Sequence, residues 1–104
     1  MQRTAFKMKL KPGFANEYQK RHNEIWPELT QLIKDAGIHD YSIFLDEETN
    51  TLFAVQKQAG KCSSQALGDS PVVKRWWAYM EDIMETNPDS SPISIPLFEI
   101  FRLD

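Results

Sequence analysis

Alternation of apolar and polar residues marks the strands of this chain. Residues 3–11 read RTAFKMKLK, in which every second residue from Phe6 to Leu10 is apolar. A period of two predicts a strand with one buried face. Residues 39–46 alternate in the same way, and residues 51–57 hold a largely apolar run after the polar stretch EETN. These two segments therefore predict a β-hairpin.

Apolar residues at helical spacing separate the strands. Residues 14–25 place aromatic and apolar side chains three or four positions apart, which predicts a helix. Pro27 has no amide hydrogen to donate, so it interrupts this helix and opens a second one that ends at Gly37. Ser70 and Pro71 are a favourable start for a third helix. Its apolar stripe comprises Val73, Trp76, Trp77, Met80, Ile83 and Met84.

The order of these elements predicts an α+β fold. A last strand over residues 95–103, with Pro96 at its start or at a sheet edge, completes the order strand, helix, strand, strand, helix, strand. In this order the segments before and after Pro27 count as one interrupted helix. This order is typical of the ferredoxin-like β-α-β-β-α-β fold, in which helices cover one face of a four-stranded antiparallel sheet. We expect residues 1–104 to form one such domain.

Several strands carry apolar residues on both faces. Phe53 follows Leu52 in the third strand, and Phe98 follows Leu97 in the last. In a monomer, the face that the helices do not cover would be wet. A second sheet from another copy would cover these side chains, so the pattern predicts a homodimer.

The composition is that of an ordinary globular chain, with 41% hydrophobic and 26% charged residues. No apolar run approaches the roughly 18 residues that cross a bilayer, and the start MQRTAFKMKLK lacks the apolar core of a signal peptide. The single cysteine, Cys62, fits a reducing compartment. The apolar pattern, the start of the chain and the single cysteine together lead us to expect a cytoplasmic location. Cys62 falls in residues 58–69, which we expect to be a loop with at most a short helical turn.

Charge and motifs exclude several function classes. A net charge of -3 and a pI near 5.3 argue against binding to a nucleic-acid backbone. The sequence contains neither HExxH nor paired cysteines, and neither GxGxxG nor GxxxxGK, so no metal and no nucleotide cofactor is expected. His39 lies near a loop without companion groups and is expected to be structural.

The stretch YQKRHNEIWPEL contains the strongest catalytic candidate, His22. A histidine with an ordinary pKa of about 6.5 both accepts and donates protons near neutrality. Tyr18 lies four residues earlier, so the two side chains share one helical face. Its hydroxyl is suited to hydrogen bonding with a ligand. A lone helical histidine is more often a surface or core residue, and this pairing is what favours the catalytic interpretation.

Aromatic residues supply candidates for a ligand wall. Trp76 and Trp77 are adjacent, and neighbouring residues on a helix point about 100° apart. One is expected in the core, while the other presents a flat face of the kind that stacks on a sugar. Burial of both in the core and a partner interface is equally compatible with the sequence. Tyr41 is in phase with Ile43 and Leu45, so it is either a binding residue or a core tyrosine.

Four segments together resemble the L-rhamnose mutarotase family nearly end to end: YQKRHNEIWPEL, HDYSIFLD, KRWWAYM and NPDSSPI. The resemblance implies a ferredoxin-like fold paired as a dimeric α/β barrel. It implies interconversion of the α and β anomers of L-rhamnose without a cofactor. By the same resemblance, His22 is the proton-donating catalytic residue, and Tyr18, Tyr41, Trp76 and Trp77 contact the sugar. Residues 60–69 depart from the family's charged helical segment.

Two other function classes are also compatible with the sequence. Small dimeric α/β-barrel proteins include oxygenases and haem-handling proteins, in which one helical histidine ligates iron. A noncatalytic sugar-binding module would hold the same sugar but leave anomer exchange at its spontaneous rate.

Overall fold

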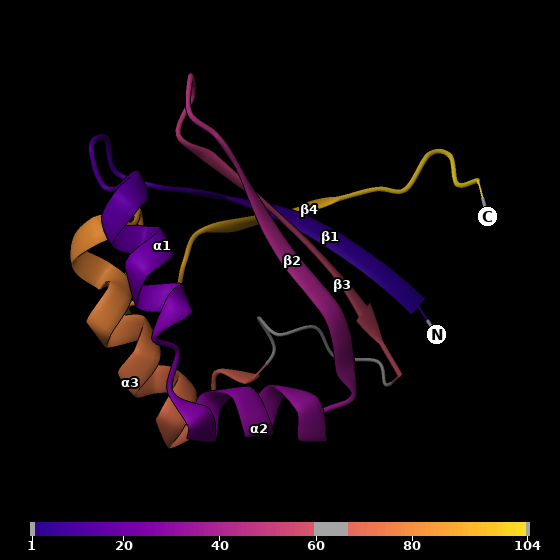
Figure 1. The fold of residues 1–104 in the computed structure, drawn as a ribbon, viewed down its shortest axis with the longest axis horizontal. Helices are drawn as coiled ribbons and strands as arrows, with labels where there is room; N and C mark the ends of the chain where they lie inside the picture. Colours follow the sequence, from indigo (N-terminus) through magenta and orange to yellow (C-terminus); the bar gives the residue numbers. More distant parts are fainter. Residues whose placement is uncertain (1, 60–66, 104) are drawn as a thin grey trace.

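The structure is a computed structural model that describes residues 2–59 and 67–103. Its sheet has the strand order β2-β3-β1-β4, and every neighbouring pair is antiparallel. The helices lie together on one side of the sheet, and the chain beyond β4 extends away from the body (Figure 1). This is the ferredoxin-like α+β arrangement, so the predicted fold is confirmed. The elements are β1 (Gln2–Lys9), α1 (Ala15–Asn23), α2 (Pro27–Asp35), β2 (Ile38–Asp46), β3 (Thr51–Gln58), α3 (Pro71–Met80), the 3-10 turn η2 (Glu81–Ile83) and β4 (Ser94–Leu97).

Alternation in β1 sets one wall of the core. Phe6, Met8 and Leu10 are 4%, 4% and 1% exposed, as the period of two predicts. They pack with apolar residues of β3 and α3. Met8 of this layer forms part of the floor of a pocket.

The helix break at Trp26 and Pro27 is also confirmed. Trp26 has extended backbone angles (φ -62°, ψ 131°) as the N-cap of α2, and Pro27 is the first residue of that helix. Gly37 follows α2 with φ +84°, a left-handed conformation that glycine adopts at little cost. The break directs α2 away from the axis of α1, so that each helix contributes its own wall to the pocket.

The end of the third helix differs from the prediction. α3 stops at Met80, one 3-10 turn follows, and Met84 is extended and bridges to Leu10. The amide of Lys11 donates to the carbonyl oxygen of Ile83 at 2.9 Å, so this segment runs beside the end of β1. Met84 is 4% exposed in this position. The continuous helix expected through Met84 is therefore wrong, because a buried apolar residue fits either backbone.

The last strand is shorter than predicted. β4 covers Ser94–Leu97 and pairs with β1, whereas residues 98–103 are in no strand. The strand expected over residues 95–103 is thus wrong beyond Leu97. Apolar and polar residues continue to alternate in residues 98–103, but these residues do not pair with a neighbouring strand. Its apolar side chains are strongly exposed: Phe98 86%, Ile100 95%, Phe101 78% and Leu103 85%.

The loop expected at residues 58–69 is described only at its ends. Gln58 closes β3, and residues 67–69 form a turn that leads to α3. Residues 60–66, and with them Cys62, lie outside the described residues. Among residues 2–59 and 67–103, no helix has the length and apolar character needed to cross a membrane.

Candidate active site

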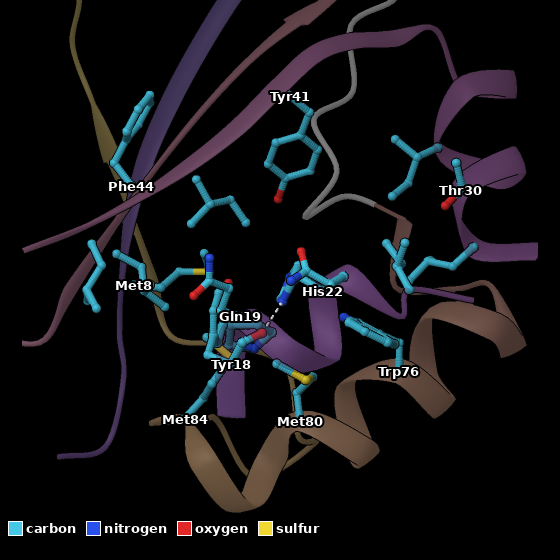
Figure 2. Close-up of a pocket in the computed structure, with 18 of the residues that line it drawn as sticks. Met8, Tyr18, Gln19, His22, Thr30, Tyr41, Phe44, Trp76, Met80 and Met84 are labelled. Carbon is cyan, nitrogen blue, oxygen red and sulfur yellow. Dashed lines mark hydrogen bonds between the residues drawn. The ribbon is translucent and has the colours of Figure 1, made fainter. Parts of the chain in front are cut away.

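A pocket of about 960 Å³ opens between the helices and the sheet. Its lining comes from α1, α2, β2 and α3, with a floor from the apolar side of β1 and β3. Figure 2 shows His22, Tyr41 and Trp76 projecting into this space from three different elements. The structure brings together all five residues proposed from the sequence: Tyr18, His22, Tyr41, Trp76 and Trp77.

His22 is held by its own helix. Its Nδ1 atom lies 3.1 Å from the carbonyl oxygen of Tyr18 (Figure 2). A carbonyl oxygen only accepts hydrogen bonds, so Nδ1 carries the proton and donates it. In the neutral ring, Nε2 then keeps a free lone pair. Burial lowers the pKa of His22 below its usual 6.5, opposed in part by the Tyr18 hydrogen bond, so the neutral ring prevails at pH 7.

Tyr18 stacks against this imidazole. The two ring centroids are 4.2 Å apart and the planes meet at 27°. Tyr18 is 8% exposed, and burial raises the pKa of its hydroxyl far above the usual 10, with a smaller contribution from the neighbouring Tyr41. Its hydroxyl therefore stays protonated and can donate a hydrogen bond, but it cannot act as a base near neutrality.

Tyr41 reaches the pocket from the opposite wall. It lies on β2, is partly buried, and its hydroxyl points toward His22 (Figure 2). Tyr18 and Tyr41 line the same pocket. Helix and sheet thus each contribute a phenol to one pocket.

Both tryptophans are buried and both line the pocket. Trp76 is 8% exposed and meets His22 edge-on, with ring centroids 5.5 Å apart and planes at 89°. It also packs edge-on against Trp26 at 5.1 Å. Trp77 is 9% exposed and lies against Gly68, where an added Cβ would stand 2.8 Å from its ring. Both residues belong to the buried core, as the second alternative from the sequence expected, and both also line the pocket.

Several residues at the site were not found from the sequence. Met8, Met80 and Met84 line the pocket beside the candidates (Figure 2). The sequence pattern predicts that each is a buried apolar residue, but it does not reveal which buried residues border a cavity. His39, expected to be structural, lines the rim and is exposed.

A polar cluster behind the pocket was also missed. Arg21 donates to Glu17 at 2.8 Å, to the carbonyl oxygen of Tyr79 at 2.7 Å and to both carboxylate oxygens of Asp82 at 2.9 and 3.2 Å. Its guanidinium lies 4.5 Å from the centre of the Tyr79 ring. The spacing of Glu17 and Arg21 was visible, whereas Asp82 lies 61 residues away along the chain. This cluster joins α1 to the end of α3.

Within the described ranges, no group of three or more histidine, cysteine or carboxylate side chains could hold a metal ion. The chemistry that the described side chains offer at this pocket is proton transfer by a neutral imidazole, hydrogen bonding by phenols, and contact with aromatic faces.

Comparisons with known proteins give a consistent result. The family model described as L-rhamnose mutarotase matches residues 3–103. Relatives named L-rhamnose mutarotase from Phocaeicola vulgatus and Bacteroides thetaiotaomicron are each 59% identical over 104 residues, covering 100% of both chains. The crystal structure of an L-rhamnose mutarotase from Formosa agariphila superposes with a TM-score of 0.92 at 54% identity, again covering 100% of each chain.

Proposed function

This chain belongs to the L-rhamnose mutarotase family, and we propose that His22 is the group through which it interconverts the α and β anomers of L-rhamnose. The resemblance inferred from the sequence motifs is confirmed. The protein is an enzyme, an isomerase that acts on carbohydrates. Full-length likeness to relatives of that name is the observation that carries the activity. The assignment of individual residues rests on the pocket.

The reaction needs a proton to move between two oxygens on one carbon. When the pyranose opens, the anomeric hydroxyl loses a proton, the ring oxygen gains one, and the bond from C1 to the ring oxygen breaks. Rotation about the C1–C2 bond and closure on the other face give the opposite anomer. A single imidazole can serve both oxygens because both are bonded to C1.

His22 is suited to this transfer. Its Nε2 lone pair takes the proton from the anomeric hydroxyl, and the resulting imidazolium returns it to the ring oxygen as the ring opens. Because burial lowers the pKa of His22, the imidazolium gives up its proton readily. Positioned acid–base catalysis of this kind contributes about 10²- to 10⁴-fold.

The other pocket residues bind rather than transfer protons in this proposal. The hydroxyls of Tyr18 and Tyr41 hydrogen-bond the sugar. Trp76 and Trp77 contact its apolar face and the methyl group of a 6-deoxy sugar. Such a methyl in an apolar pocket discriminates by only about 1–3 kcal/mol, so hydroxyl geometry contributes to specificity as well.

The activity is tested by polarimetry. The pure α anomer of L-rhamnose is dissolved, and the optical rotation is followed with and without protein. We expect the approach to equilibrium to quicken in proportion to protein concentration. Binding of L-rhamnose without any acceleration would favour the noncatalytic sugar-binding module. Haem absorption in the purified protein, with activity that depends on iron, would favour the oxygenase or haem-handling class.

We also propose that two copies of the chain pair as a dimeric α/β barrel. The exposed apolar residues on the sheet and beyond β4 support this pairing, since a second copy would cover them. Phe44 is 61% exposed on β2, and Phe98 is 86% exposed just after β4. Sedimentation would show twice the chain mass of 12.1 kDa. We propose further that residues 1–104 form one domain that works in the cytoplasm.

A further inference from the structure

The pairing of β2 with β3 changes register beside Tyr41. Ile38 pairs with Gln58 and His39 with Lys57, whereas Ser42 pairs with Val55 and Ile43 with Ala54. Asp40 and Tyr41 therefore stand together opposite one residue of β3, Gln56. Two residues opposite one define a β-bulge.

The bulge changes which side chains face the helices. Ile38 and Ile43 are five residues apart, so an unbroken strand would place them on opposite faces. Their partners Gln58 and Ala54 are four apart and share one buried face of β3. The extra residue of the bulge thus places Ile43 on the same face of the sheet as Ile38. Ile38 closes the core, and Tyr41, in phase with Ile43, turns toward the pocket.

The backbone of Asp40 makes this phase change. Its φ is +46°, in the left-handed region that most residues avoid and that aspartate, asparagine and glycine tolerate best. Its carboxylate lies 3.2 Å from Lys57 Nζ, but the side chains are 71% and 39% exposed. An ion pair that is so exposed to solvent contributes little to stability. The conformation of Asp40, more than its charge, holds the bulge.

We propose that Asp40 is a positioning residue, whose left-handed backbone in the β2 bulge directs Tyr41 into the active-site pocket. Bulges beside active sites commonly re-aim a side chain in this way. The inference rests on the proposed function, since it requires Tyr41 to contact the sugar. Asp40 itself borders the pocket, and the role assigned to it here is exerted through its backbone conformation.

Four variants at Asp40 separate backbone from charge. Asp40→Gly and Asp40→Asn keep access to positive φ and remove the ion pair, so KM for L-rhamnose should remain as in the wild type. Asp40→Val disfavours positive φ strongly, and Asp40→Ala does so more mildly. If Tyr41 then loses its hydrogen bond to the sugar, KM should rise about threefold to tenfold with little change in kcat. The alanine variant keeps the test available if the valine variant folds poorly.

A matched control and a double variant complete the test. Asn50, in the turn between β2 and β3, has φ +55° and does not line the pocket. Asn50→Val should lower stability like Asp40→Val and leave KM alone. In a Tyr41→Phe background, Asp40→Val should raise KM no further, because both changes act through one hydroxyl.

Three outcomes that would overturn the inference can be told apart. If Tyr41→Phe raises KM and Asp40→Val does not, the bulge has no positioning role, while the proposed function stands. If Asp40→Val raises KM equally in both backgrounds, Asp40 does not act through the Tyr41 hydroxyl, and the inference is overturned. If Tyr41→Phe leaves KM unchanged, Tyr41 does not bind the sugar, and the residue assignment in the proposed function fails together with the inference.

Discussion

The Nδ1 atom of His22 donates a hydrogen bond to the carbonyl oxygen of Tyr18, 3.1 Å away and one helical turn earlier. The same two residues stack their rings at 4.2 Å. Backbone and side chain of Tyr18 therefore fix both the tautomer and the plane of the imidazole. A ring held in this way presents Nε2 in one orientation, which is what a proton shuttle between two neighbouring oxygens requires.

The pH dependence of activity should follow the neutral form of His22. Burial lowers the pKa of His22 below 6.5, so the free Nε2 lone pair persists when the pH falls somewhat below that value. We expect kcat/KM to be level near neutrality and to decline with a midpoint below 6.5. A series of rates between about pH 5 and pH 8 would show it. A midpoint above 6.5 would mean that His22 is stabilised in its charged form.

Stability should respond to the same group. The folded state binds a proton at His22 less readily than the unfolded chain does. The stability linked to His22 is therefore present above pH 6.5 and is lost as the pH falls through the lower folded-state pKa. Removing the titrating ring in His22→Gln should make the unfolding free energy less sensitive to acidification over this range. If the unfolding free energies of the wild type and of His22→Gln are equally sensitive to acid, burial does not lower the pKa of His22.

Tyr18→Phe should weaken sugar binding without changing the acid limb of the pH profile. The variant keeps the ring stacked on His22 and loses only the hydroxyl, so KM should rise about threefold to tenfold. Because the pKa of Tyr18 is raised well above 10, the wild type should show no loss of activity from this phenol below about pH 10. An alkaline limb near pH 9 that disappears in Tyr18→Phe would show that the hydroxyl ionises.

Arg21→Ala should destabilise the fold. The Arg21 side chain is only 11% exposed and pairs with Glu17 on its own helix. It joins α1 to the end of α3 through Asp82 and the Tyr79 carbonyl. Losing charge-assisted hydrogen bonds in this geometry should cost about 1–3 kcal/mol in urea unfolding. Arg75 is the matched control, since its contact with Glu28 is 3.4 Å long and both side chains are more than half exposed. Arg75→Ala should cost less than about 1 kcal/mol.

Gly68→Ala should disturb Trp77. The added Cβ would stand 2.8 Å from two atoms of the indole, which is buried and has little room to move. Overpacking of this kind costs about 1–3 kcal/mol, and we expect KM for L-rhamnose to rise as the ring shifts. Gly13→Ala is the control, because Gly13 has φ +86° and nothing within 4 Å of the new Cβ. It should lower stability and leave KM unchanged.

Periodicity and breaker residues were enough to predict most of the fold. The period of two in β1 and β2, the helix break at Pro27 and the glycine after α2 all follow from local rules. Those rules fail where tertiary contacts decide the backbone. A buried apolar residue such as Met84 would fit the end of a helix, but Met84 instead bridges to Leu10. The alternation of apolar and polar residues continues after Leu97, although the strand ends there.

The site was predictable only in part for a related reason. Tyr18 and His22 are linked by helical geometry, so their pairing could be inferred from spacing. Tyr41 was correctly placed in phase with Ile43, but the register change that Asp40 introduces has no local signal. The sequence could not reveal that Arg21 meets Asp82, because only the packing of two helices brings them together.

The role of His22 in anomer exchange is tested most directly by saturation-transfer NMR on equilibrated L-rhamnose. Exchange between the α and β resonances is measured without protein, with the wild type and with His22→Ala. We predict fast exchange with the wild type and near-spontaneous exchange with the variant, which should still bind the sugar. Wild-type exchange rates in a correctly folded His22→Ala protein would remove this histidine from the mechanism.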